Sequence, residues 1–447
     1  MLTSSLGSVL FALLLGILII IILSTRYKMH PFFSLSIACI ITGLLGGLSF
    51  TEILLTMKEG FGKIMSSLAF IIVIGTALGM TLQASGATFV MSETILKFVG
   101  ARRSVLATSV TGFVVGVPIF CDSGYIVLNG LNKSMIKRTG IAAIIMSTAL
   151  ATGLYAIHCM IPPHPGATSA AGTINASYGI VILYGIIVAF PAMLAGYFWA
   201  VFYGKKMNEP KNETTDKDDV ELNEKLPGIF ASFLPVVLPI LLIALRAVFA
   251  SESSPVSNNF LNKFLVIGDP SIALTIGLIL ALLIIKNKQK AGLQSLMTTA
   301  IEKAGGILII IGAGAAFGAI INALKIHELI SNTDFLSTLG LLYPFLIAFI
   351  LKTAQGSSTV AVLTAASIVL PFLPVLNLDT ENGRVLAVLA MGAGSMGVSH
   401  VNDSYFWVIA NFSKLKLKPM LKVFTVATFW MSVVAMLFVY LLSLILL

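Results

Sequence analysis

Charged residues are scarce in this chain of 447 residues, at 11%, whereas hydrophobic residues make up 57%. Soluble globular domains carry about a quarter of their residues as charged side chains, so this composition excludes that class. Cysteine is scarce too, since Cys39, Cys121 and Cys159 are the only three and lack the paired spacing of a zinc site or a disulfide framework. No Walker motif occurs, so ATP is not the implied energy source. We expect an all-α polytopic membrane protein with no cofactor and no metal.

Basic residues nevertheless exceed acidic ones, which gives a formal net charge of +9. In a soluble chain this would suggest nucleic acid as a partner, but in a membrane protein Lys and Arg retained in cytoplasmic connections explain it. Their distribution among the connections places both termini outside. Arg102 and Arg103 precede the apolar stretch 104–132, and Lys133 and Lys137 follow it. Because both flanks are basic, we expect this stretch to enter the membrane and return as a re-entrant hairpin.

The other apolar stretches predict about ten transmembrane helices, two of them broken at mid-membrane, and a second hairpin that enters from outside. Each half of the chain then has the same order of parts, and the second half is inverted relative to the first. Inverted repeats with broken helices are the recurring plan of secondary transporters. A cytoplasmic linker, 204–227, is expected between a first repeat, 1–203, and a second, 228–447. The expected parts are helices within 1–83, the hairpin 104–137, the broken helix 141–175 and the helix 177–203, then helices within 228–323, the hairpin 336–376, the broken helix 385–411 and the helix 423–447.

Four polar clusters interrupt the apolar segments, one at each hairpin and one at each predicted break. A polar group in hydrocarbon is costly unless it is satisfied, so polar groups that recur in both halves are expected to be functional. Half-helix N-termini at such breaks direct backbone N–H groups at one place, which suits a carboxylate or another anion. The candidate substrate-binding residues are Asp122, Ser123, Gly124, His158, His164, Gln355, Gly356, Ser357, Ser358, Thr359, His400 and Asn402.

Of the 19 acidic residues, only Asp122 and Asp403 lie deep inside apolar segments. An intramembrane carboxylate can relay protons, ligate Na+ or cap an unwound helix end. We predict proton coupling for both, with helix capping as the alternative, particularly for Asp403, which precedes a short helix from Ser404. Lys352 stands three residues before Gln355 and is suited to pair with the substrate carboxylate, to pair with Asp403 or to snorkel to the surface.

Three of the five histidines belong to the clusters: His158, His164 and His400. Histidine titrates nearest neutral pH, so these side chains suit a coupled proton and equally suit a neutral hydrogen-bond donor. Their spacing is not that of a metal site. The hydroxyls of Ser357, Ser358 and Thr359 suit a polar organic anion, and the alternative is hydrogen bonding to carbonyls of their own helix.

In these clusters the chain resembles the gluconate/proton symporters of bacteria, within the ion transporter superfamily. The similarity also covers the order and length of the segments along the whole chain. The stretches that carry it are Val117 to Gly124, His158 to Gly166, Ala354 to Ala361, and Ser399 to Ser404 with Phe406 and Trp407.

The resemblance implies proton-driven uptake of sugar acids such as gluconate in the bacterial inner membrane. It also implies a homodimer in which an outer scaffold holds two moving substrate units, an elevator mechanism. Three positions depart from the family pattern: Cys121 and Ser123, on either side of Asp122, and Lys352, where arginine is usual. These departures leave a smaller acid such as glycerate open as the substrate.

Two other functions remain open from the sequence. The first is a sodium-coupled symporter of a carboxylate or of an amino acid such as D-serine, because related folds bind Na+ through unwound backbone. The second is an intramembrane enzyme that uses Asp122 and Asp403 as a catalytic dyad. The inverted repeat argues against the enzyme, since a protease has no use for two hairpins that enter from opposite sides.

Overall fold

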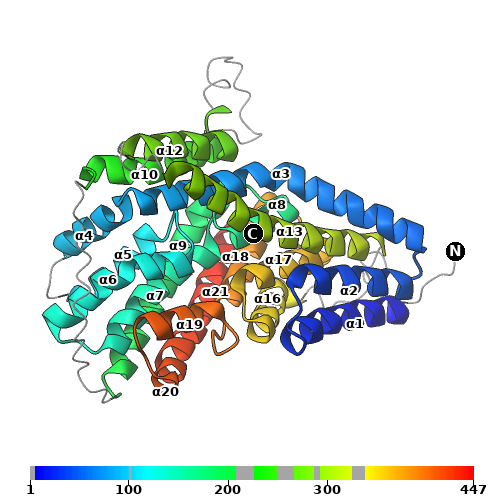
Figure 1. Cartoon of the computed structure of the whole chain (residues 1–447). Coiled ribbons are helices and arrows are strands. Elements are labelled where there is room, and N and C mark those ends of the chain that lie inside the picture. Colours follow the sequence, from blue (N-terminus) through cyan, green and yellow to red (C-terminus); the bar gives the residue numbers. More distant parts are fainter. Residues whose placement is uncertain (1–5, 100–102, 208–225, 250–265, 286–291, 325–337) are drawn as a thin grey trace.

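The computed structural model describes residues 6–99, 103–207, 226–249, 266–285, 292–324 and 338–447. Within these ranges all regular structure is helical, which confirms the all-α class (Figure 1). Most of the expected linker, residues 208–225, lies outside the described residues. The repeat and linker boundaries therefore stay a prediction.

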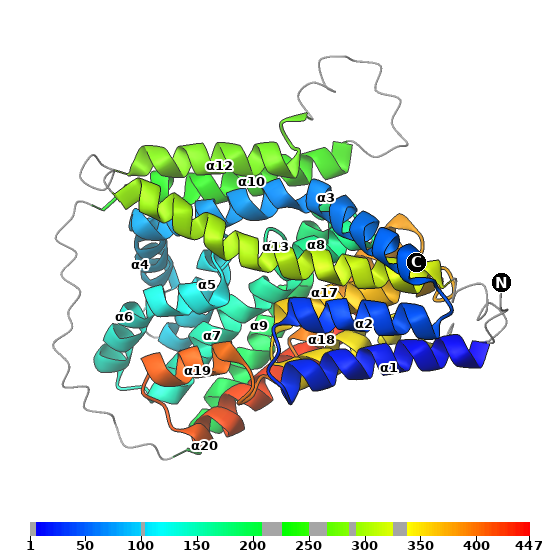
Figure 2. The same ribbon diagram turned by 45° about the vertical axis from the view of Figure 1, so that its right-hand side comes forward.

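Six helices form an outer layer along the top and right of Figures 1 and 2. α1 packs on α2 and α10 packs on α12, while the long helices α3 and α13 pack on each other. Capping residues mark the start of two of these helices. Ser49 forms a capping box with Glu52 at the start of α3, and Asp269 caps α12. The six helices are α1 (Leu6–Thr25), α2 (Pro31–Leu45), α3 (Phe50–Ala84), α10 (Ile229–Phe249), α12 (Pro270–Ile284) and α13 (Leu293–Ala323).

The two long helices, α3 and α13, have glycines at equivalent positions. Gly75 and Gly79 of α3 match Gly314 and Gly318 of α13, and each helix ends five residues after its second glycine. A Cβ added at Gly79 would collide with the carbonyl oxygen of Pro118, at the tip of the first hairpin. The glycine therefore lets the outer layer approach the hairpin backbone closely.

The hairpins are built from α5 (Ser104–Val115) with α6 (Cys121–Thr139), and α16 (Leu342–Gln355) with α17 (Ser358–Val369). Three of the four arms have 12 to 14 residues, fewer than the ~20 needed to cross a bilayer, and α6 has 19. Gly356 ends α16 in the left-handed region, with φ of 81°, which permits the sharp turn into α17.

Each predicted broken helix is observed as two helices. α7 (Ala143–Met160) is followed by α8 (Pro165–Thr173), and α18 (Glu381–Ser395) is followed by α19 (Ser404–Phe412). The prolines at 162 and 163 remove backbone N–H donors, which ends α7. α8 packs on α17 and α19 packs on α6, so the second part of each broken helix contacts the hairpin of the other repeat. This crossed arrangement brings both hairpins and both breaks to one region.

The last helix of each repeat is a full-length span. α9 (Tyr178–Gly204) packs on α21 (Val426–Leu446), which follows α20 (Leu417–Met420) and a π-helical turn, Leu421–Thr425. A short 3-10 turn, Leu370–Phe372, ends α17. Six helices in the described residues have the length and apolarity to cross a membrane, counting α7 and α8 as one.

One helix was not expected from the sequence. α4 (Ala87–Val99) lies between the helices predicted within 1–83 and the hairpin predicted from 104. Its 13 residues include Ser92, Glu93 and Lys97, so it is too short and too polar for a spanning segment. A search for runs of about 20 apolar residues cannot detect such a helix.

Candidate functional site

A cavity of about 410 Å³ lies where the two hairpin tips and the first break meet α13. Five of its lining residues were predicted from the sequence as substrate-binding residues, and they come from both repeats. The lining residues are Phe120, Asp122, Ser123, His158, Pro165, Lys303, Ile307, Ile310, Ser357, Thr359, Val360 and Leu363.

The first hairpin contributes Asp122 and Ser123 from the first turn of α6. Phe120 precedes this helix and provides no side-chain cap, so the N-terminal N–H groups of α6 remain available at the cavity. The Oδ1 atom of Asp122 is buried and has no hydrogen-bond partner. A buried oxygen without a partner is unusual, and its position beside a cavity is suited to a proton or a ligand.

Two histidines of the first break form a directional chain of hydrogen bonds. His164 Nε2 lies 2.9 Å from the carbonyl oxygen of Gly116, so this nitrogen carries a hydrogen and donates it. His164 Nδ1 lies 3.2 Å from His158 Nδ1 and accepts from it when His164 is neutral. His158 Nε2 is then an acceptor for the Thr359 hydroxyl at 3.4 Å. This series of hydrogen bonds connects Thr359 of the second hairpin to Gly116 of the first through the neutral imidazoles of His158 and His164.

The second hairpin contributes Ser357 and Thr359. Ser357 is the N-cap of α17, where its hydroxyl accepts from the backbone N–H of Val360 at 3.3 Å. Because the Thr359 hydroxyl donates to His158, its oxygen lone pairs remain available to accept a hydrogen bond from a ligand in the cavity.

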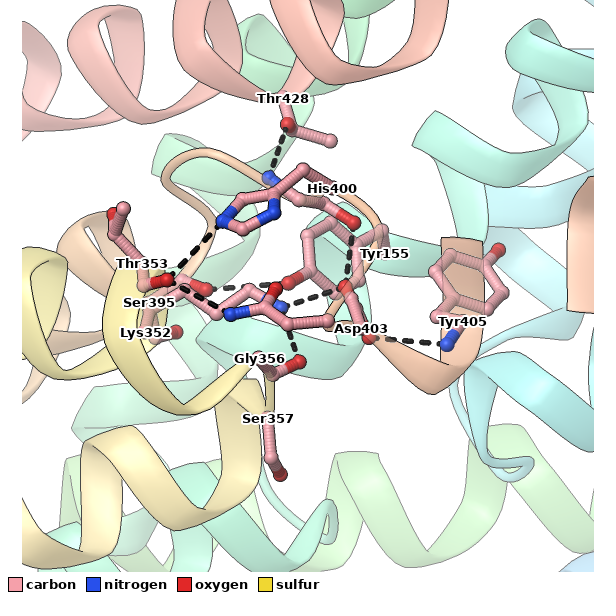
Figure 3. A network of polar contacts seen from close by, with 12 residues as sticks. Tyr155, Lys352, Thr353, Gly356, Ser357, Ser395, His400, Asp403, Tyr405 and Thr428 are labelled. Atoms are coloured by element: carbon pink, nitrogen blue, oxygen red, sulfur yellow. Dashed lines mark hydrogen bonds and ion pairs between the residues drawn. The ribbon is translucent and has the colours of Figure 1, made fainter. Parts of the chain in front are cut away.

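Asp403 is held in a separate buried network, shown in Figure 3. Lys352 Nζ lies 2.6 Å from Asp403 Oδ2, and it also donates to the carbonyl oxygen of Gly356 at 2.8 Å. The Ser399 hydroxyl donates to the same Oδ2, and Asp403 Oδ1 accepts from the backbone N–H of Tyr405. Both oxygens of Asp403 therefore have partners, and Asp403 caps α19. Of the three roles considered for Lys352, the structure shows the ion pair with Asp403.

Two further predicted site residues, His400 and Asn402, hold the end of α16. Asn402 Nδ2 donates to the carbonyl oxygens of Thr353 and Ala354, and His400 Nε2 lies 3.2 Å from the Thr353 oxygen. Neither lines the cavity. These interactions satisfy carbonyls that the helix end leaves free. A substrate contact for either residue stays a prediction.

The remaining predicted site residues also lie outside the cavity lining. Gly124 faces Leu154, and Gly356 lies against the backbone of Asn402. Ser358 is buried in α17, and the amide atoms of Gln355 are buried without partners. Their direct contact with a substrate likewise stays a prediction.

Lys303 is the cavity residue that the sequence interpretation missed. The apolar run in the sequence begins only at residue 304, so Lys303 has the position of a basic residue in a cytoplasmic connection. α13 begins earlier, at Leu293, so Lys303 lies inside the helix and lines the cavity on the same face as Ile307 and Ile310. The signal available in the sequence was the i, i+4, i+7 spacing of these three residues.

The chemistry of the cavity is that of a binding site for a small polar molecule. Its described lining includes one carboxylate, one ammonium, three hydroxyls and a histidine, on an otherwise apolar wall. Within the described residues, no group of three or more His, Cys, Asp and Glu side chains is placed to hold a metal ion. Asp403 is engaged by Lys352, an arrangement unlike a catalytic pair of carboxylates.

The family model of the GntP family permeases matches residues 8–445. The chain belongs to the GntP permease family. The gluconate permease of Pseudomonas aeruginosa is 32% identical to this GntP-family permease, over 97% of each chain. The D-serine transporter DsdX of Escherichia coli K12 is 31% identical, over 96% of this chain and 97% of its own. Family membership and the apolar helices together make the protein a multi-pass membrane permease.

A solved structure supports the fold. The crystal structure of the YdaH transporter of Alcanivorax borkumensis, described as having an unusual topology, superposes with a TM-score of 0.63. The match covers 93% of this chain and 99% of that chain at 14% identity. At this identity the comparison concerns the fold alone.

Proposed function

We propose that this permease imports a small hydroxylated monocarboxylate, gluconate or a smaller acid such as glycerate, together with protons. The observation that carries the proposal is the cavity between the two repeats, into which an unpaired carboxylate, three hydroxyls and a histidine project. The gluconate permease among the relatives supports a sugar acid as substrate. We place the protein in a bacterial inner membrane with both termini outside.

Asp122 is our proton carrier, and Asp403 is not. Asp403 already has partners for both oxygens, one of them a buried lysine, so protonating it would leave Lys352 as an uncompensated buried charge. Asp122 has an oxygen without a partner and lines the cavity, so protonation there breaks no observed hydrogen bond. This contrast assigns the coupling role, predicted for both acids, to one.

The hydroxyls of Ser123, Ser357 and Thr359 are placed to bind the polar groups of the substrate. Thr359 accepts from a substrate hydroxyl because its own hydrogen is directed to His158. The chain of neutral histidines fixes the direction of this hydroxyl, so His158 and His164 act on the substrate through Thr359.

For the transport step we propose an elevator within a homodimer. The outer layer of α1, α2, α3, α10, α12 and α13 serves as the scaffold, and the hairpins with the broken helices move against it. In support, Gly79 of α3 lets the backbone of the first hairpin tip approach closely, which suits one surface passing another.

A second candidate substrate is a small amino acid such as D-serine. The D-serine transporter among the relatives favours it, as does the free Asp122 oxygen, which can accept from an ammonium group. A counterflow assay in proteoliposomes, with gluconate, glycerate and D-serine as competitors, distinguishes the candidates. We expect gluconate or glycerate to compete in counterflow. In a separate assay of uptake against a substrate gradient, a collapsed pH gradient should abolish accumulation. Competition by D-serine alone would favour the second candidate, and uptake that requires Na+ but ignores the pH gradient would refute proton coupling.

A further inference from the structure

We propose that Lys303, on the outer helix α13, binds the substrate carboxylate in this conformation and selects anionic over neutral substrates. The inference rests on the proposed transport of a small carboxylate and adds the residue that recognises the anion. Lys303 lines the same cavity as Asp122, Ser123 and Thr359, which belong to the hairpins.

The position of Asp122 makes a separate cation necessary. The N-terminus of α6 is an anion-attracting end, but Asp122 already places a carboxylate in its first turn. A substrate carboxylate at the same helix end would meet this like charge or depend on its protonation. Lys303 is the one cation in the described cavity lining, and it forms no ion pair with any described residue.

The two walls of the cavity therefore differ in chemistry. On α13 the cation is followed by Ile307 and Ile310 on the same face, which offer no competing polar group. The hairpins supply the hydroxyls and the acid. This arrangement orients a hydroxy acid with its carboxylate towards α13 and its hydroxyls towards the hairpin tips.

Charge balance links this cation to the coupled proton. With Asp122 ionised, Lys303 and Asp122 cancel, and a bound monoanion leaves one net negative charge beside the buried Asp122 oxygen. With Asp122 protonated, the lysine and the substrate cancel instead, so proton and anion bind more favourably together than either does alone. Lys303 thus supplies the positive charge that makes co-binding of one proton and one anion electrically neutral.

The test compares gluconate with its neutral amide, gluconamide, as competitors of counterflow in proteoliposomes. We expect Lys303→Gln to raise the half-inhibitory concentration of gluconate roughly 10- to 100-fold, the range lost with a charged hydrogen bond, and to leave that of gluconamide almost unchanged. Lys303→Arg should retain most of the preference for the acid. Melting temperatures of the purified variants show whether each one is folded.

Lys63 provides a matched control. It is an exposed lysine on α3, the helix equivalent to α13, at nearly the same distance before the glycine pair, but it does not line the cavity. Lys63→Gln should leave both half-inhibitory concentrations unchanged. Equal preference for the acid in wild type and Lys303→Gln would overturn the role of Lys303 and leave the proposed transport intact. A wild-type protein that exchanges neither gluconate, glycerate nor D-serine would overturn both proposals.

Discussion

The two breaks of this permease solve the same structural problem with different chemistry. In each repeat, one residue comes directly before the second helix of the break, α8 or α19. That residue is linked to the backbone carbonyl of the glycine at the end of the first hairpin arm, α5 or α16. In the first repeat, neutral His164 donates directly to Gly116. In the second, Asp403 binds Lys352, which donates to Gly356. The first link is a neutral hydrogen bond and the second is a buried ion pair.

This difference separates a break that an ion pair stabilises from a break whose nearby carboxylate is free for the proposed proton coupling. A buried ion pair is costly to break from one side, since removal of either partner leaves an uncompensated charge. A neutral link has a smaller energetic role and leaves the nearby carboxylate, Asp122, free to change its protonation. The second repeat therefore holds its break with a buried ion pair, and the first repeat, with the histidines, carries the acid that we propose to titrate.

The largest effect is expected from breaking the ion pair on one side. Lys352→Met should destabilise the protein by about 3–5 kcal/mol, because Asp403 would remain as a buried, unpaired carboxylate. The double variant Lys352→Met/Asp403→Asn should recover much of this loss. Melting temperatures in detergent provide the measurement. A double variant as unstable as Lys352→Met alone would refute the account.

The turn between the arms of the second hairpin comes next. Gly356→Ala should cost about 2 kcal/mol, since φ is 81° and the new Cβ would collide with the Asn402 carbonyl. Gly140→Ala is the control, because Gly140 has φ of 65° as a helix C-cap but open space around it. It should lose less stability than Gly356→Ala. Equal melting temperatures of the two variants would show that the contact with Asn402 contributes nothing.

A smaller effect is expected at the neutral link. His164→Asn should cost about 1 kcal/mol, because asparagine can cap α8 but removes the hydrogen bond to Gly116. His30→Asn tests the same change at the exposed N-cap of α2, where we expect a change within about 0.5 kcal/mol. A loss at His164 as large as that of Lys352→Met would contradict the contrast between the two breaks.

The smallest effect on stability is expected at the proposed proton carrier. Asp122→Asn should change stability by less than about 0.5 kcal/mol, since its buried oxygen has no partner to lose. The same variant should lose pH-driven accumulation and keep substrate exchange, because the amide cannot carry a proton. Uptake against a gradient and counterflow, measured on the same proteoliposomes, separate the two activities. Accumulation equal to wild type would remove Asp122 from the coupling mechanism.

Much of the site could be predicted from the sequence because hydrocarbon makes polar residues conspicuous. Asp122, Ser123 and His158 were identified in this way, and the structure places all three in the cavity lining. His400 and Asn402 belong to equally conspicuous clusters, yet they bind carbonyls of α16. Composition cannot distinguish a polar group that faces a cavity from one that satisfies a helix end. Lys303 escaped notice for the opposite reason, since a lysine next to an apolar run looks like a flank.

The sequence by itself determined the membrane location, the helical class and the four interruptions, because these depend on local properties: length of apolar runs, proline and glycine positions, and polar residues within them. Only the tertiary structure decided the partners. Lys352 and Asp403 are 51 residues apart in the chain, and Thr359 and His158 are 201 apart. Contacts over such separations follow from how the two repeats pack across each other, which no local pattern records. For that reason the number of intramembrane acids was visible in the sequence, but which acid is free was not.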